Sequence, residues 1–151
     1  MKKKVSNILV GVSGKYFVAT ELSRRGYIAS ITLRNTKGID IVATNENGNK
    51  SVNIQVKTTS KVKWWLLSKK HETIRDKNIF YVFVHLNENN ELPIFHIVPS
   101  RYVARRVKSG HKKWLETPGR NGQMHNDSNM RVWGDEKNKY LDKWDLLELD
   151  K

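Results

Sequence analysis

Asp40, Gln55 and Lys57 combine two kinds of oxygen ligand with a cation in a short stretch of sequence. Alternation along the segment 52–58 places Gln55 and Lys57 on one side of a strand, two residues apart. If the segment 39–44 pairs with it as a hairpin, Asp40 comes to lie near both. A carboxylate and an amide oxygen suit Mg²⁺, which keeps several of its waters. Such an ion would polarise a phosphodiester, while Lys57 positions the attacking water or stabilises developing charge.

The same spacing also has a purely structural explanation. One face of a half-exposed strand carries polar side chains as a matter of course, and a D…Q-x-K pattern is short. Spacing alone favours this explanation, so the elements that would bring these residues together have to be considered.

Periodicity and turn signals divide the chain into short elements. The predicted segments, from the N-terminus, are a helix over 12–25, strands over 27–33, 39–44, 52–58, 79–86 and 93–98, a helix over 100–108 and a short amphipathic element over 140–147. Turn signals at 35–38 and 45–49 separate the first three strands. The order is α-β-β-β-(loop or helix)-β-β-α, which is typical of a mixed α/β domain.

Several residues define the bounds and faces of these elements. Ser13 is predicted to cap the first helix and Gly26 to end it. One side of that helix carries Gly11, Lys15, Val18, Ala19 and Leu22. The segment 79–86 is apolar without alternation, which predicts burial on both faces. Ser100 caps the second helix and Gly110 lies just beyond it, a polar loop covers 117–128, and Trp144 and Leu147 are expected to pack on the core.

Three segments taken in order resemble the PD-(D/E)xK phosphodiesterase superfamily, the fold of many restriction enzymes and Holliday-junction resolvases. They are GKYFVATELSRRGY at 14–27, KGIDIVA at 37–43 and NIQVKT at 53–58. The resemblance covers about the first 60 residues. It implies a restriction-endonuclease-like mixed central β-sheet flanked by helices, in a single nuclease domain over 1–151.

The resemblance also implies roles for the three polar residues. Asp40 would be the metal-binding acid, Gln55 would stand at the variable metal-side position, and Lys57 would be the catalytic lysine. Glutamine at that position is similar to the Q-x-K variant of methyl-directed restriction nucleases. The implied cofactor is Mg²⁺, with Mn²⁺ as a substitute, and the implied activity is hydrolysis of DNA, by a protein that in many relatives is a homodimer.

Two departures from the family pattern affect the metal site. Ile39 stands where many relatives have Pro, and the first helix offers Lys15 where relatives often place a Glu. Lys15 can contact a phosphate but cannot bind metal, and Glu21, an additional candidate acid, lies on the flank of that helix face. Asp40 would then bring the only charge to the cation. A catalytically inactive, nucleic-acid-binding descendant is therefore the main alternative.

The charge of the chain favours a nucleic-acid partner. There are 28 Lys and Arg against 15 acids, a formal +13, and six of the acids but only four lysines lie from Asp135 onward. Such a field attracts phosphate backbones. Behind the Q-x-K segment, Thr58, Ser60, Lys61 and Lys63 are candidates to clamp phosphates. A basic surface with an acidic protein partner is a third alternative.

Other basic and aromatic residues allow two interpretations each. Trp64 and Trp65 could stack on a base, or pack in the core, and packing is expected for at least one of them. A second basic segment either lies along the nucleic acid or forms a solvated helix face: Arg101, Arg105, Arg106, Lys108, Lys112 and Lys113.

Several classes of function are excluded or disfavoured. The chain has no Cys, so disulfides and thiolate catalysis are excluded, and its five His lack zinc-site spacing. No stretch approaches the roughly 20 apolar residues that span a bilayer, and no signal-peptide pattern is present. A cytoplasmic protein without a membrane partner is expected.

Overall fold

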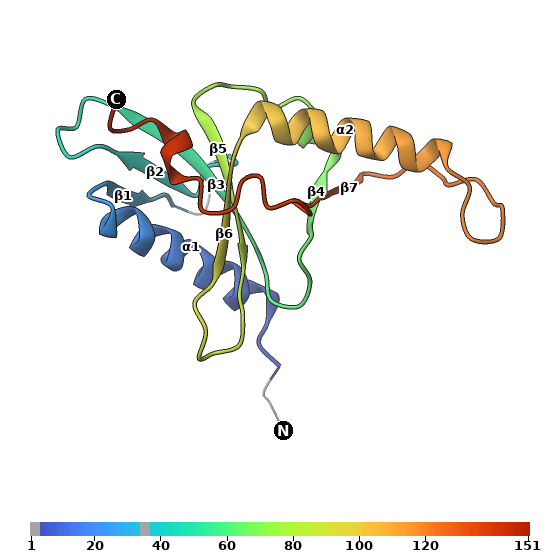
Figure 1. The fold of residues 1–151 in the computed structure, drawn as a ribbon, viewed down its shortest axis with the longest axis horizontal. Coiled ribbons are helices and arrows are strands. Elements are labelled where there is room, and N and C mark those ends of the chain that lie inside the picture. Colours follow the sequence, from blue (N-terminus) through green and yellow to red (C-terminus); the bar gives the residue numbers. More distant parts are fainter. Residues whose placement is uncertain (1–3, 34–36) are drawn as a thin grey trace.

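The computed structural model describes residues 4–33 and 37–151 (Figure 1). Its elements in chain order are α1 (Asn7–Arg24), β1 (Ile28–Ile31), β2 (Ile41–Thr44), β3 (Ser51–Thr59), β4 (Trp65–Ser68), the 3₁₀ turn η1 (Lys69–Glu72), β5 (Ile79–His85), β6 (Ile94–Pro99), α2 (Ser100–Glu116), β7 (Met130–Trp133) and the 3₁₀ turn η2 (Trp144–Leu147). Asn35 and Thr36 of the predicted turn at 35–38 lie outside the described residues.

Five of the strands form a mixed central sheet in the order β1-β2-β3-β5-β6. β3 and β5 run parallel, and every other neighbouring pair in this sheet is antiparallel. The hairpin predicted for β2 and β3 is confirmed, with Ile41 opposite Ile54. The connection from β3 to β5 contains β4 and η1, so the optional element of the predicted order is a strand and a 3₁₀ turn rather than a helix.

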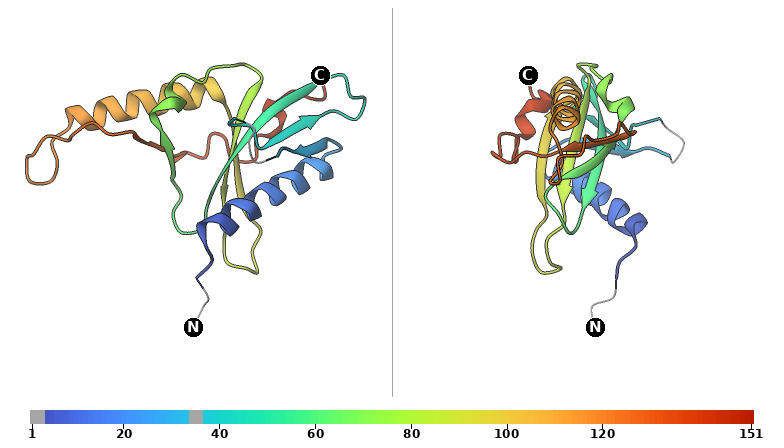
Figure 2. Two further views of the ribbon diagram at one scale, coloured as in Figure 1. Left: turned by 180° about the vertical axis from the view of Figure 1, so that it is seen from behind. Right: turned by 90° about the vertical axis from the view of Figure 1, so that its right-hand side faces the viewer.

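The two faces of the central sheet are covered by different layers (Figure 2). α1 and the C-terminal segment around η2 cover one face, where Val18 and Leu22 meet Ile54 and Val82 in the main core. α2 and the small β4–β7 sheet cover the other face, where the core is largely aromatic. Residues of β5 enter both cores, which confirms the predicted burial of this strand on both faces. Trp144 and Leu147 are buried as expected.

The first helix begins earlier than the sequence predicted. Its N-cap is Ser6, whose hydroxyl accepts a hydrogen bond from the amide of Leu9, and Ser13 lies inside the helix. The apolar run 8–10 continues the helical pattern across Gly11, which a helix tolerates at a cost of about 1 kcal/mol. The buried residues of α1 are Val10, Gly14, Val18 and Leu22. The inward face is therefore rotated from the predicted one, and Lys15 lies at its edge.

The second helix is twice as long as expected, because Gly110 lies within it rather than beyond it. Only its N-terminal half carries the buried residues Val103, Ala104 and Val107, so its remaining turns extend past the sheet. Together with the loop at 117–129, which is irregular as predicted, they project from the body of the molecule (Figure 1). We call residues 109–129 the arm.

β7 returns from the arm and pairs with β4, an interaction that the sequence did not predict. Trp65 lies opposite Trp133 in this antiparallel pair, and both are buried. Buried Arg131 in β7 forms an ion pair with Glu72 of η1, which joins the return of the arm to the turn before β5. In the described part of the chain, no helix has the length and hydrophobicity needed to cross a bilayer.

Gly14 sets how closely α1 approaches β3. A Cβ on Gly14 would lie 1.9 Å from Oγ1 of Thr58 and 2.8 Å from both its Cβ and its Cγ2, so no rotation of the Thr58 side chain relieves the clash. We therefore expect Gly14→Ala to lower the free energy of unfolding by about 1–3 kcal/mol in urea denaturation.

Gly11 is the matched control, since a Cβ there meets nothing within 4 Å. Gly11→Ala should leave stability unchanged or raise it by up to about 1 kcal/mol. Equal stability of the Gly14→Ala protein and the wild type would show that the helix moves away from the sheet without cost.

Candidate active site at the start of β2 beside β3

Asp40 lies at the point where the chain enters β2. Gly38, with a φ of +66°, turns the chain toward the strand, a backbone conformation that favours glycine. The amide of Asp40 donates to the carbonyl of Ile54 at 2.8 Å, which continues the β2–β3 pairing by one residue. Its Oδ2 accepts a hydrogen bond from the amide of Val56 at 2.8 Å. Asp40 is therefore held against β3 by hydrogen bonds to the two residues that flank Gln55.

Lys15 contacts the same carboxylate from α1. Its Nζ lies 2.8 Å from Oδ1 of Asp40, and the two side chains are 39% and 21% exposed. Since the other oxygen is bonded to Val56, both carboxylate oxygens have partners. The Lys15 position predicted to face the site does so, but it contacts the acid directly.

Gln55 offers an acceptor that no described residue satisfies. The residue is 6% exposed, and its Oε1 is buried without a hydrogen-bond partner among the described residues. A buried polar atom in this state costs about 1–3 kcal/mol unless a water or ion binds it. The orphaned oxygen fits a hydrated cation that keeps most of its waters.

The donor set for a metal is nevertheless small. Over residues 4–33 and 37–151, no group of three His, Asp or Glu side chains could hold an ion. Asp40 supplies one carboxylate and Gln55 one amide oxygen, so the residues fit Mg²⁺ bound weakly and mainly through water.

Lys57 lies on the same side of β3 as Gln55, as the alternation predicted. Burial lowers its pKa most strongly, the carboxylate of Asp40 raises it, and Lys70 and Lys15 lower it, with a net decrease. Lys57 is thus a partly dehydrated cation within the electrostatic reach of Asp40. The structure brings all three predicted residues together where β2 begins beside the central strand β3.

His71 and Tyr81 extend the polar region behind these residues, and no sequence signal pointed to them. Tyr81 on β5 is the register partner of Gln55, and its ring lies 5.7 Å from that of His71. Both side chains are buried, and neither ring nitrogen of His71 nor the hydroxyl of Tyr81 has a hydrogen-bond partner in the described chain. Burial, with lesser contributions from Lys57 and Lys70, lowers the pKa of His71 to about 4.

A cleft of about 390 Å³ opens beside Lys57, between the start of α1 and the segment after β3. Thr58, Ser60 and Lys61 line it, as their predicted role requires, although the Thr58 side chain also packs against Gly14. Lys63 does not line this cleft and instead borders a separate hollow with His85 and Pro93.

The two tryptophans after β3 point in different directions. Trp65 is 2% exposed and its indole donates to the carbonyl of Val84, whereas Trp64 is 44% exposed and lines the cleft. The expectation that at least one of them packs in the core is confirmed.

Glu21 is not brought to the site. Its carboxylate forms ion pairs with Arg24 and Arg25 on the same helix, and in the described structure no contact joins it to Asp40. Burial alone would raise the pKa of Glu21, but the two guanidinium groups lower it overall. No contact that the structure describes supports its use as an additional acid.

Neither any protein-family model nor any curated protein sequence matches the chain. In structure it is similar to a bacterial homing endonuclease, I-Ssp6803I, with 16% identity and a TM-score of 0.53 over 96% of this chain and 94% of that chain. It is also similar to Hjc, a Holliday junction resolvase from the archaeal hyperthermophile Archaeoglobus fulgidus, with 16% identity and a TM-score of 0.46 over 84% of each chain.

At this identity the likeness to the homing endonuclease shows a shared fold. The restriction-endonuclease-like fold, with its mixed central sheet flanked by helices, is therefore confirmed. The Q-x-K variant and the roles of the site residues stay predictions.

His71 should make stability depend on pH. Its pKa is about 4 in the folded state against an ordinary 6.5, so the unfolded chain binds a proton first. The contribution of neutral His71 to the free energy of unfolding is fully present above pH 6.5. It is lost as the pH falls toward 4, by up to about 3 kcal/mol. Between pH 7 and pH 4, His71→Phe should lose less unfolding free energy than the wild type in urea denaturation. Parallel curves for the two proteins would contradict the buried neutral imidazole.

Proposed function

We propose that the protein is a Mg²⁺-dependent endonuclease that hydrolyses phosphodiester bonds in DNA. The observation that supports this most is the meeting of Asp40, Gln55 and Lys57 where β2 begins beside β3, in a chain with an endonuclease fold. A strand face with merely solvated polar residues would not bury Gln55 or leave its oxygen without a partner.

Each residue has a role that follows from its position. Asp40 and the orphaned oxygen of Gln55 hold the ion, with Mn²⁺ as a substitute, and a bound ion polarises the phosphate and activates water. Lys57 donates to a phosphate oxygen or to the attacking water, and its partial dehydration strengthens that hydrogen bond. Ser60 and Lys61 contact the adjacent phosphates along the cleft.

A second function, binding of nucleic acid without cleavage, is favoured by one specific contact. The ion pair between Lys15 and Asp40 neutralises the one carboxylate that residues 4–33 and 37–151 bring to the proposed metal site. In a catalytic protein, Lys15 has to leave Asp40 and move to a substrate phosphate when the ion binds. In a non-catalytic protein the ion pair is permanent, and the basic surface alone binds the phosphate backbone.

Lys57→Ala is the direct test of catalysis. With Mg²⁺ or Mn²⁺ and supercoiled plasmid, we expect the wild type to nick DNA and the variant to be slower by at least about 100-fold, as when one transition-state donor is lost. The rate of nicking on gels is the measurement.

Lys63→Ala is the matched control, because it removes the same charge six residues away and outside the cleft. It should cleave at close to the wild-type rate. A wild type that binds DNA in a salt-sensitive manner but never nicks it would overturn the endonuclease in favour of the binding protein.

Lys15→Gln tests the competition for Asp40. Removing the lysine charge beside the carboxylate should tighten Mn²⁺ binding by about tenfold, measured by titration calorimetry, while weakening DNA binding slightly. Lys15→Arg, which keeps the charge, should bind Mn²⁺ like the wild type. Unchanged Mn²⁺ affinity in Lys15→Gln would show that Asp40 does not hold the ion.

A further inference from the structure

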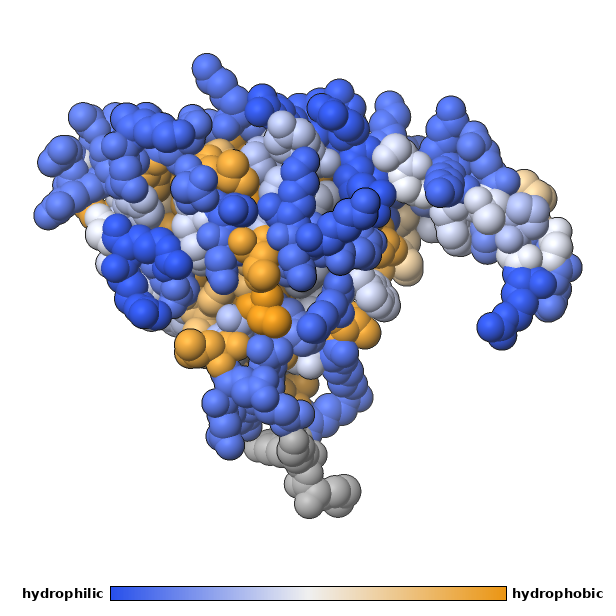
Figure 3. All heavy atoms as spheres, in the orientation of Figure 1, coloured by the Kyte–Doolittle hydropathy of each residue, from blue (hydrophilic) through white to orange (hydrophobic). Residues whose placement is uncertain are grey.

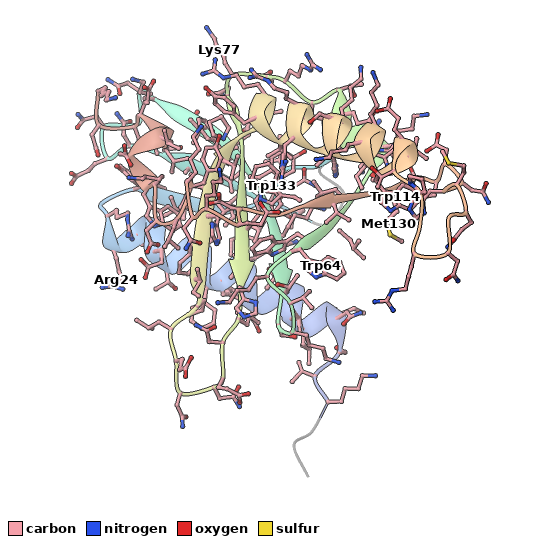
Figure 4. All side chains as sticks on the ribbon, turned by 45° about the vertical axis from the view of Figure 1, so that its right-hand side comes forward. Arg24, Trp64, Lys77, Trp114, Met130 and Trp133 are labelled. Carbon is pink, nitrogen blue, oxygen red and sulfur yellow. The ribbon has the colours of Figure 1, made fainter. Side chains whose placement is uncertain are left out.

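A second hollow lies between the arm and the small β4–β7 sheet, beside the cleft that Lys57 lines, which we call the catalytic cleft. It has a volume of about 540 Å³, and we call it the arm groove; Trp64, Arg106, Lys113, Trp114, Met130 and Val132 are among the residues that line it. Trp64, Met130 and Trp114 come from three different segments and lie along the same side of the molecule (Figure 4). Trp64 also lines the cleft that contains Lys57, so the two hollows share one wall.

The floor of the arm groove is more apolar than the outward face of a small sheet usually is. Alternation along β4 and β7 buries Trp65 and Trp133 and turns Met130 and Val132 outward into the groove, where each is about half exposed. Leu66, opposite Val132, is also outward and lines the neighbouring cleft. Outward positions on a half-buried sheet are normally polar. Figure 3 shows hydrophobic surface beside the place where the hydrophilic arm leaves the body. These half-exposed side chains lie outside the buried core, so they are available to contact a ligand.

The two exposed tryptophans differ in what they can offer. Trp114 is stacked against His125, with ring centres 4.0 Å apart, and His111 lies on it at 5.4 Å, fixed in turn by Asp127. Trp114 is thus a rigid wall. Trp64 makes no ring contact within the described structure and is 44% exposed, so the open part of its ring is accessible for stacking.

The rim of the arm groove is cationic. Its positive charge comes from Lys113, because Arg106 pairs with Glu136 and buried Arg131 pairs with Glu72. Lys113 has no acidic partner in the described part of the chain. A second copy of the chain would bring the same positive rim against this one, which opposes self-association through this face. Aromatic and apolar walls with a positive rim match unpaired nucleotides, whose bases stack and whose phosphates are negative.

We propose that the arm groove binds unpaired nucleobases of the strand whose phosphates lie in the catalytic cleft, with Trp64 as the stacking residue between the two hollows. This inference rests on the proposed endonuclease and makes its substrate a DNA with a single-stranded segment, such as a flap or loop, next to the scissile bond. A uniform duplex would fill the cleft and leave the groove empty.

The test compares a short labelled single strand with the duplex of the same sequence, by fluorescence anisotropy without divalent metal. Trp64→Ala should weaken single-strand binding by about tenfold, the loss of one base–aromatic stack, and leave duplex binding within about twofold. Trp64→Phe should restore most of the affinity. Equal loss on both DNAs, or none on either, would overturn the proposal.

Val132→Glu provides a second variant that lies in the arm groove but not in the catalytic cleft. It should weaken single-strand binding more than Leu92→Glu, which makes the same change at an exposed leucine outside the groove. If Val132→Glu instead alters only the sedimentation of the protein, the groove is a self-association surface and the proposal is wrong.

Failure of this inference is distinguishable from failure of the proposed function. Asp40→Asn should lose plasmid nicking and keep the Trp64-dependent preference for single strands. Nicking by the wild type without that preference overturns the arm groove alone. A preference for single strands in a wild type that never nicks overturns the endonuclease and leaves a single-strand-binding groove.

Discussion

The hydrogen bond from the amide of Val56 to the carboxylate of Asp40 joins the fold to the candidate site. Just before β2 begins, the Asp40 side chain extends the pairing with β3, and the acid is fixed beside Gln55 by the same geometry that aligns the strands. The left-handed turn at Gly38 delivers Asp40 to this place. Displacement of this acid would disturb both the β2–β3 pairing and the candidate ligand set, so the position of the site depends on the pairing of these strands.

Local patterns were sufficient to predict the elements up to β3, apart from the earlier start of α1. Alternation in 52–58 placed Gln55 and Lys57 on one face, and polar loops identified the hairpin, because these signals lie within a few residues of what they determine. β4 and β7 were missed, since Trp65 and Trp133 pair over a long separation and each strand has only four residues. The predicted end of the second helix before Gly110 was wrong, because an exposed helix tolerates a glycine in its interior.

The site itself was predictable only as far as residue types allowed. Asp40, Gln55 and Lys57 followed from strand geometry and from resemblance, but the contact between Lys15 and Asp40 depends on the height and rotation of α1 over the sheet. His71 and Tyr81 could not be predicted, since η1 brings His71 against Tyr81, the neighbour of Gln55 on β5, only when it packs against α2. Buried groups without partners are a property of packing, which periodicity does not encode.

The close approach of Gly14 to Thr58 has a consequence for sequence change over time. Lys15 is the next residue in the chain. The short distance between α1 and β3 that glycine permits at position 14 therefore also decides whether the lysine at position 15 reaches Asp40. A larger residue at 14 would lift this turn of the helix and release the acid. Among homologues we therefore expect positions 14, 15 and 58 to vary together, with small residues at 14 accompanying a basic residue at 15.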